Sequence, residues 1–360
     1  MESKIVFEDN SLVKLLRAAA QQRNTKAEDV VQKAVRLSFN EDGQVLVYYT
    51  DRLVYSIARV QSDSSEKRDI IVDLETLMKV MSFNRDRAVF FFDHGNLHGL
   101  LDEGTIFIPQ YRVSPLLFEA NITAEEKIEE RRMSKADLLR AIKTVKKVIS
   151  SAELPEMRMM YGTSEGVFGC NGTTVIKNKT PFINGVIRLK DLAIVQEILG
   201  ENEDPVGARL FSNRIDILSP YQKLSLPRRD IALSNQYIRS VEHLESYFVV
   251  DPARLYRVLT LLSTLPHDAG HMLLSIKTIE GRKVLLGITT TSRGEMSKIT
   301  ISDRLVGDME PTSFRIKTKV LADTVYGFLH EREMNISILH DMLKFENSLT
   351  QAAVVTSLVQ

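Results

Sequence analysis

Cysteine is almost absent from this 360-residue chain, which has a single one, Cys170. One thiol cannot form a disulfide within the chain, and it cannot build a cysteine-based zinc or iron–sulfur site. The lack of disulfides agrees with a reducing compartment, so we expect a cytoplasmic protein. Cys170 itself lies in an alternating, strand-like stretch with no base assigned nearby, which favours a buried structural residue over a nucleophile.

Long hydrophobic runs are also missing. One of the longest purely apolar stretches, residues 88–92, is far short of the ~18 residues of a membrane-spanning helix. Residues 1–4 lead directly into an Ile-Val-Phe segment with no signal-peptide core. With 44% hydrophobic and 26% charged residues, the composition is that of soluble globular proteins, and we expect no membrane partner.

Neither sign of charge is in excess. The chain has 47 Lys and Arg against 47 Asp and Glu. This balance gives no overall field that favours nucleic acid or a membrane. Any site for a polyanion must therefore be local.

Sequence signatures of common enzymes are lacking as well. There is no Gly-x-x-x-x-Gly-Lys-Ser/Thr loop, no Gly-x-Gly-x-x-Gly opening a helix and no His-Glu-x-x-His. Two histidine pairs, His94 with His98 and His267 with His271, have the i, i+4 spacing that binds a metal on a helix. Both pairs lie among Gly, Asp or Pro residues that indicate loops. We therefore predict no metal, no other cofactor and no enzyme activity.

What the sequence does contain is a repeat. A short strand leads into an amphipathic helix, and alternating strand-like segments with turn residues follow. One such hairpin is signalled by Asp42-Gly43 and another by Glu280-Gly281. The unit occurs six times, with opening strands at residues 5–7, 70–73, 132–134, 186–189, 248–251 and 314–317.

Each helix of the repeat is predicted to bury one face. Apolar residues recur at i, i+3, i+4 and i+7, which is the spacing of a helix that packs one stripe on a core. Asp73, Ser134 and Asp251 stand where a side chain could cap the first turn. The six apolar stripes are Leu12, Leu15, Leu16 and Ala19; Leu74, Leu77, Met78 and Met81; Leu138, Ile142, Val145 and Ile149; Leu192, Val195 and Leu199; Leu255, Val258, Leu259 and Leu262; and Leu321, Val325 and Phe328.

The six repeats are predicted to associate in pairs. One helix with about four strands cannot close a core alone. A charged stretch at residues 123–130, whose signs alternate, predicts a solvated connecting helix or linker, and residues 228–245 form the second joint. We therefore expect an α+β protein with three similar domains, at residues 1–122, 123–240 and 241–360.

The outward stripes of the helices are basic in five of the six repeats, although the chain as a whole is neutral. Taken singly, such a helix face is more often ordinary solvated surface. Recurrence at equivalent places favours a function, because Lys and Arg contact phosphates without reading base sequence, as a nonspecific DNA-tracking protein requires. The candidate DNA-binding residues are Lys14, Arg17, Arg23, Lys26, Lys79, Lys143, Lys146, Lys147, Arg254, Arg257 and Lys319.

This organisation resembles that of the bacterial DNA polymerase III beta sliding clamp family across essentially the whole chain. Short segments also match. Thr-Asp-Arg at residues 50–52 is similar to the family's Thr-Asp-Leu turn, and residues 169–175 are similar to its Ala-Thr-Asp-Gly-His-Arg-Leu segment. Leu-Pro at residues 226–227 resembles the pair that closes the family's second domain, and residues 353–360 resemble its Val-Val-Met-Pro-Met-Arg-Leu ending. The resemblance implies a DNA-clamp fold, with six strand-helix-strand repeats in three similar domains, and a head-to-tail dimeric ring that encircles double-stranded DNA.

In the resembled family the ring is a processivity factor and not an enzyme. It tethers DNA polymerase and the clamp loader through a groove for their short linear motif. An apolar groove beside a sheet edge suits an extended peptide with hydrophobic anchors. Carried over residue by residue, the groove is predicted at Gly172, Thr174, Val175, Pro227, Val354, Val355 and Leu358.

The resemblance also implies where the homodimer closes. Leu261 and Leu262, at the end of a helix, are expected to meet the sheet edge of the neighbouring first domain near Ile106 and Phe107. The alternative is that both leucines belong to the core, since Leu262 continues the buried stripe of its helix.

The chain departs from the family pattern at particular positions. Thr173-Thr174 replaces a His-Arg pair and Thr356-Ser357 replaces Met-Pro, so partner preference is expected to differ. Arg158, followed by two methionines, resembles an Arg-Tyr-Tyr loop that touches DNA, but methionine removes the stacking rings. The neutral charge also departs from a usually acidic family. We interpret the chain as a divergent clamp of an unusual replisome or a phage; the alternative is a clamp-like DNA-binding scaffold in another transaction, such as phage transcription or repair.

Overall fold

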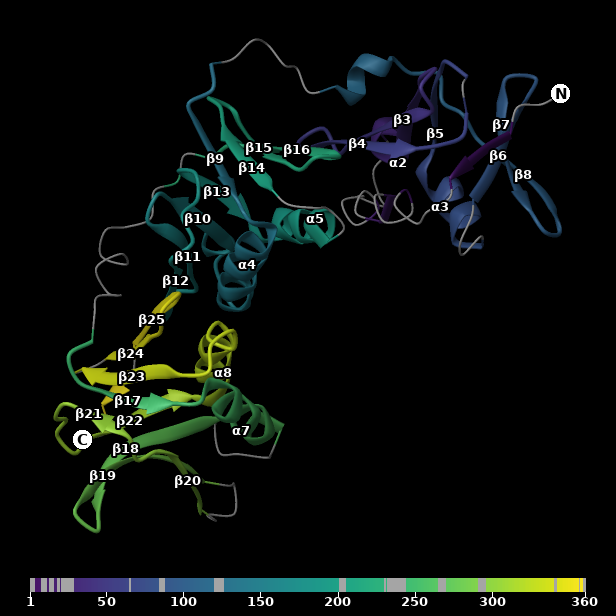
Figure 1. Cartoon of the computed structure of the whole chain (residues 1–360). Helices are drawn as coiled ribbons and strands as arrows, with labels where there is room; N and C mark the ends of the chain where they lie inside the picture. The colour runs from purple at the N-terminus through teal and green to yellow at the C-terminus, as the bar shows by residue number, and fades with distance from the viewer. Residues whose placement is uncertain are drawn as a thin grey trace. The chain divides into compact units, whose positions relative to one another are not determined.

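The computed structural model describes residues 4–358, apart from residues 8–11, 13–15, 18–19, 21–28, 65, 84–87, 120–125, 201–204, 230, 232–243, 265–269, 291–295, 340–341 and 356. The chain divides into two compact units: unit 1 is residues 1–135 with 190–229, and unit 2 is residues 136–189 with 230–360. Both units contain helices and antiparallel sheets, as the sequence predicts (Figure 1).

Unit 1 contains two antiparallel sheets and the helices beside them. Its strands are β1 (Lys4–Phe7), β2 (Ala34–Phe39), β3 (Gln44–Thr50), β4 (Tyr55–Gln61), β5 (Arg68–Asp73), β6 (Ala88–Asp93), β7 (Asn96–Leu101), β8 (Gly104–Ile108), β9 (Glu129–Met133), β14 (Val206–Leu210), β15 (Arg214–Leu218) and β16 (Gln222–Pro227). Its helices are α2 (Val30–Lys33), α3 (Leu74–Phe83), α5 (Leu189–Gly200) and the short 3-10 helix η1 (Pro115–Phe118). The strand order is β5-β2-β3-β4-β16-β15-β14-β9 in the larger sheet and β1-β6-β7-β8 in the smaller one.

Unit 2 has the same construction. Its strands are β10 (Met159–Thr163), β11 (Gly166–Cys170), β12 (Thr174–Asn178), β13 (Gly185–Arg188), β17 (Tyr247–Val250), β18 (His271–Ile279), β19 (Arg282–Thr290), β20 (Met296–Ser302), β21 (Leu305–Val306), β22 (Ser313–Lys317), β23 (Met334–Leu339), β24 (Met342–Glu346), β25 (Thr350–Val355) and β26 (Ser357–Leu358). Its helices are α4 (Lys135–Ser150), the 3-10 helix η2 (Pro155–Met157), α7 (Pro252–Thr264) and α8 (Thr318–Tyr326). The strand order is β13-β10-β11-β12-β25-β24-β23-β17-β21 in one sheet and β20-β19-β18-β22-β26 in the other.

The predicted turns form where the chain needs residues with positive φ. Gly43, between β2 and β3, has φ 72°, and Asn40 holds this turn by accepting the Gln44 amide at 2.8 Å. Between β18 and β19, Glu280 and Gly281 have φ 50° and 76°. Two successive positive φ values are typical of the tight turn whose twist matches an antiparallel hairpin.

The predicted helix faces are buried. In α7, Leu255, Leu259 and Leu262 are at most 4% exposed. Of the first helix only a few residues are described, and Leu12 and Leu16 among them are fully buried. Apolar stripes of this kind supply most of the free energy that holds a helix on a sheet.

Two of the predicted helix caps are confirmed. The Asp73 carboxylate accepts the Thr76 amide at 2.7 Å, and the Asp251 carboxylate accepts the Arg254 amide at 3.0 Å. Each bond satisfies a backbone donor that has no partner inside the helix.

Neighbouring repeats interlock by exchanging their opening strands. β1 pairs with β6, and β5 pairs with β2. The next two repeats do the same through β9 with β14 and β13 with β10, and the last two through β17 with β23 and β22 with β18. The six repeats therefore form three interlocked pairs, while the predicted domain boundaries fall on residues outside those described.

Three expectations about local structure are corrected. Glu129 and Glu130 are not linker residues, because they begin β9, where Arg209 donates to Glu130 at 3.0 Å. Met159 and Met160 do not form a loop, because they begin β10 and are buried.

The histidines provide the third correction. His98 and His271 lie in strands β7 and β18 and not in loops. In the part of the chain that is described, no three His, Cys, Asp or Glu side chains gather as a metal site. No helix within it is long and apolar enough to cross a membrane. Cys170 is buried at the end of β11.

Candidate functional site

Three helices of unit 2 bring predicted DNA-binding residues together. The Nζ of Lys147 on α4 lies 4.0 Å from the Asp323 carboxylate on α8 and 5.9 Å from the centre of the Tyr326 ring. Tyr326 in turn packs against Tyr256 on α7, with ring centres 5.6 Å apart. The helices α4, α8 and α7 therefore lie side by side, and Figure 1 shows α7 next to α8.

The outward faces of these helices are positively charged. Lys143, Arg254, Arg257 and Lys319 are exposed, and within the described residues none of the four forms an ion pair. Burial lowers the pKa of His330, just beyond α8, and the positive charges of Arg140 and Lys143 lower it further. Unpaired cations on neighbouring helices make a local positive surface on a neutral chain, which suits a phosphate backbone.

The remaining predicted DNA-binding residues are more scattered. Arg17 is exposed, and Lys79 on α3 is exposed but paired with Glu75 at 2.8 Å; both belong to unit 1. Lys146 on α4 is half-buried. Arg158 is exposed in unit 2 and donates to the Ala152 carbonyl at 2.9 Å. The predictions Lys14, Arg23 and Lys26 lie outside the described residues.

Unit 2 also contains a hollow of about 610 Å³, which we call the groove. One wall is formed by Leu154, Met157, Gly172, Thr173 and Val355, and the other by Arg315, Ile316, Lys317, Lys319 and Val320. The first wall comes from the end of η2, the turn before β12 and the end of β25. The second comes from β22 and the start of α8. The groove is thus apolar on one side and mainly basic on the other.

The turn in the first wall is built by Asn171. Its side-chain oxygen accepts the amides of Thr173 at 3.1 Å and Thr174 at 2.8 Å, and its side-chain nitrogen donates to Ser151 at 2.8 Å. Gly172, between them, has φ 96°, a conformation that residues with a side chain rarely adopt. The Thr173 carbonyl then accepts the Val355 amide at 2.9 Å, which fixes the end of β25 against the turn.

The structure separates the predicted groove residues into two sets. Gly172 and Val355 line the groove, and Val355 is 56% exposed. Thr174, Val175 and Val354 are buried, because β12 and β25 are interior strands that pair with each other, Thr174 opposite Val354. β12 and β25 therefore do not form the sheet edge that was predicted beside the groove.

The last two predicted groove residues belong to other elements. Pro227 ends β16 and belongs to unit 1. Leu358 belongs to β26, where its backbone pairs with Phe314 of β22.

The predicted ring contacts lie on an edge strand and on a helix. Phe107 is 50% exposed on β8, the edge of the smaller sheet of unit 1, and Ile106 on the same strand is partly buried. Leu261 on α7 is 63% exposed, whereas Leu262 is 4% exposed and packs inward. The alternative of a core position thus applies to Leu262 and not to Leu261.

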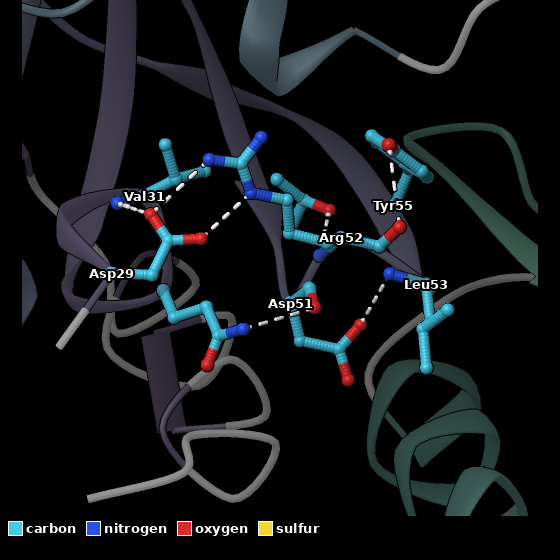
Figure 2. A network of polar contacts seen from close by, with 8 residues as sticks. Asp29, Val31, Asp51, Arg52, Leu53 and Tyr55 are labelled. Carbon is cyan, nitrogen blue, oxygen red and sulfur yellow. Dashed lines mark hydrogen bonds and ion pairs between the residues drawn. The ribbon is translucent and has the colours of Figure 1, made fainter. Parts of the chain in front are cut away.

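The Thr-Asp-Arg turn between β3 and β4 is a polar junction (Figure 2). The guanidinium of Arg52 donates to the Asp29 carboxylate at 2.7 and 3.2 Å, and the same carboxylate accepts the Val31 amide at the start of α2. The hydrogen bond from Arg52 lowers the pKa of Asp29. The Asp51 carboxylate accepts the Leu53 amide at 2.9 Å. Arg52 has φ 74°, a backbone conformation that residues other than glycine adopt uncommonly.

No protein-family model matches the chain, and no curated protein matches it in sequence. Solved structures match over its full length. The sliding clamp of Bartonella birtlesii bound to griselimycin has 14% identity and a TM-score of 0.81, covering 100% of both chains. The Caulobacter crescentus beta sliding clamp has 12% identity and a TM-score of 0.80, also covering 100% of both chains. The DNA polymerase III beta subunit of Thermotoga maritima has 14% identity and a TM-score of 0.79, covering 99% of this chain and 100% of the other.

The chain has the sliding-clamp fold. The predicted α+β fold of six repeats in three similar domains is confirmed by these full-length matches together with the interlocked repeat pairs. At 12–14% identity, the fold is preserved although few side chains are shared.

Within this sliding-clamp fold, only Gly172 and Val355 of the residues that line the groove were predicted as groove residues. Leu154 precedes η2 and Met157 ends it, both outside the repeat pattern. The sequence pattern places Arg315 in the strand before the sixth helix and Lys317 on the basic face at the start of that helix, and neither in a groove. One signal was available. In β22, buried Phe314 and Ile316 alternate with outward Arg315 and Lys317, so the period of two marks a basic strand face.

Proposed function

We propose that the protein is a sliding clamp, a non-catalytic processivity factor that encircles duplex DNA and tethers a polymerase and a clamp loader. The observation that carries the proposal is how the last strands of the repeats pair. These strands are β4, β8, β12, β16, β20 and β25. β4 pairs with β16 and β12 pairs with β25, and each pairing joins two half-sheets into one.

Two last strands are left without such a partner. Among the described residues, β8 has only β7 as a strand neighbour and β20 has only β19. An edge strand presents a row of unpaired backbone groups that can pair with another chain. If the same pairing rule continues between protomers, β8 of one pairs with β20 of its partner. Two such head-to-tail contacts close a ring.

Apolar side chains at these edges support the same assembly. Phe107 is exposed on β8, and Met296 is exposed on β20. On α7, Leu255 and Val258 line the same small hollow as residues 299–302 of β20, and Leu261 follows one turn later. Exposed apolar groups beside a free strand edge are typical of a protein–protein interface.

The basic helices and the groove supply the other two parts of the proposal. The exposed cations of α4, α7 and α8 would contact phosphates without reading sequence, so the ring could slide. The apolar wall of the groove would hold the hydrophobic anchors of a partner's extended segment. No catalytic group is needed for either task.

Trapping on end-blocked DNA tests the encirclement. A linear duplex with biotin at both ends is incubated with the protein, streptavidin is added, and the complex is washed in about 1 M NaCl, where electrostatic contacts are screened within ~3 Å. We expect the protein to remain bound to the blocked duplex and to leave it when a restriction enzyme cuts between the blocks.

The control is the same duplex without streptavidin, from which a ring slides off. A protein that washes off the blocked duplex, or that stays on the cut one, binds DNA in some way other than encirclement. Either result would overturn the proposal while leaving the fold untouched.

A further inference from the structure

On the basic wall of the groove, exposed positive charge exceeds exposed negative charge. Arg315 and Lys317 are exposed on β22 and Lys319 is exposed at the start of α8. Within the described residues, none of the three forms an ion pair. Two carboxylates line the groove: Glu153 is exposed, and Asp323 is buried beside Lys147. The solvent-facing charge of the groove is therefore strongly positive.

Two of the three cations lie on one face of a strand. Arg315 and Lys317 alternate with buried Phe314 and Ile316, so both point from the same face of β22. Residues two apart on a strand are about 7 Å apart. Like charges at this spacing repel one another, and an anionic ligand would relieve that repulsion.

The apolar wall of the groove favours a different kind of ligand group. Leu154 is 49% exposed and Val355 is 56% exposed, and both line the hollow together with Met157. Exposed aliphatic side chains in a concavity gain free energy when a ligand removes them from water. A phosphate backbone has no apolar groups that could pack against this wall, whereas a peptide can contact both walls at once.

Resting on the groove's proposed role as the docking site, we infer that its occupant is an acidic peptide, an extended segment in which Asp or Glu residues alternate with large apolar ones. An extended chain directs alternate side chains to opposite sides. The carboxylates then face Arg315, Lys317 and Lys319, and the apolar residues face Leu154, Met157 and Val355.

A pair of synthetic peptides tests this. Both are fluorescein-labelled nonapeptides with the same leucines and phenylalanine, one with four Asp and the other with four Asn. We expect the Asp peptide to bind the full-length protein about tenfold more tightly at low salt, the summed effect of a few solvent-exposed ion pairs. The preference should shrink as the salt concentration rises, because the cations are exposed.

Two sets of variants locate the effect. Arg315→Glu with Lys317→Glu should abolish or reverse the preference for Asp. Lys277→Glu with Arg282→Glu, two exposed positions on the β18–β19 hairpin, changes the net charge equally and should leave the preference intact. Leu154→Ser should weaken both peptides.

The outcomes separate this inference from the proposed function. Equal binding of the two peptides, both weakened by Leu154→Ser, would leave the groove as a docking site but overturn the acidic preference. No binding of either peptide would overturn both, while encirclement is judged separately on end-blocked DNA. Displacement of the Asp peptide by a single-stranded oligonucleotide would assign the basic wall to nucleic acid and overturn the inference.

Discussion

Lys147 Nζ on α4 lies 4.0 Å from the carboxylate of Asp323 on α8, and this contact joins two helices of the proposed DNA-facing surface. Asp323 is nearly covered, and burial raises its pKa although Lys147 and then Lys319 act to lower it. The desolvation of the carboxylate thus outweighs its attraction to the lysines. The pair fixes where Lys147 points at some cost in stability.

Asp323→Asn is therefore expected to stabilise the protein at neutral pH. Because the folded-state pKa is raised, ionised Asp323 destabilises the fold above that pKa. As the pH falls through the raised value towards the ordinary value of 3.8, the folded protein takes up the proton first and the cost disappears. Urea unfolding of the two proteins across this range should show the advantage of Asn shrinking with decreasing pH. A variant less stable than the parent at pH 7 would mean that the attraction between Asp323 and Lys147 outweighs the desolvation cost of the carboxylate.

The buried side chain of Arg36 joins β2 to the segment after β8. Its guanidinium donates to Asp69 at 2.9 and 2.7 Å, to Glu119 at 2.6 Å and to the Pro115 carbonyl at 3.2 Å. Arg36→Met should lower the free energy of unfolding by about 2 kcal/mol, because it removes the charge-assisted hydrogen bonds of a buried guanidinium, although the two exposed carboxylates regain water. Arg59→Met, on the exposed face of β4, is the matched control and should change little. A loss below ~1 kcal/mol for Arg36→Met would contradict a structural role for this cluster.

The ring contact is tested at Leu261. Light scattering should give the mass of two 40.8 kDa chains for the parent protein. Leu261→Asp and Phe107→Asp should each give one chain with an unchanged circular dichroism spectrum, because a charge in an apolar contact loses its hydration without gaining a partner. Leu116→Asp, an equally exposed leucine on η1, should remain dimeric. A parent protein that is monomeric at every concentration would remove the ring altogether.

The DNA-facing surface is tested by salt dependence. Lys143 and Arg257 are exposed and form no ion pair within the described residues, so their loss breaks no salt bridge there. Lys143→Gln with Arg257→Gln should flatten the slope of log affinity for duplex DNA against log salt by about 1.8, at ~0.9 for each phosphate contact. Fluorescence anisotropy of a labelled duplex measures this slope, with Lys277→Gln as the control. An unaltered slope would make these residues ordinary solvated surface.

The local structure of the repeats could be predicted from the sequence because it depends on short-range patterns of apolar and turn residues. The apolar stripe at Leu255, Leu259 and Leu262 predicts the buried face of α7, and the Glu280-Gly281 pair predicts the β18–β19 turn; both are confirmed. These features depend on residues within one or two turns of each other, so a single sequence contains them.

The choice of long-range partners could not be predicted in the same way. Nothing in residues 55–61 indicates that β4 should pair with β16 and not with another last strand, because all such strands share one alternating pattern. The residues that line the groove could not be predicted for the same reason. Leu154 and Lys317 come from different repeats, and long-range contacts within unit 2, among them the pairing of β12 with β25, bring their segments together. The resemblance of residues 169–175 to the family's segment predicts Thr174 in the groove, yet the interior position of β12 buries it.

The C-terminal tail gives the last prediction. Val355 is fixed to the turn before β12 by its bond to Thr173, and beyond it β26 pairs with β22 at Arg315 and Phe314. A chain that ends at Ser357 keeps β25 and loses the backbone partner of Phe314. We expect little change in thermal stability or solution mass, because the interior strand is intact. The Asp-containing nonapeptide should bind at least tenfold more weakly, because the tail borders the basic wall, and isothermal titration calorimetry measures the loss. Loss of the dimer on truncation would make the tail a structural strand, and unchanged peptide affinity would mean that Leu358 plays no part in docking.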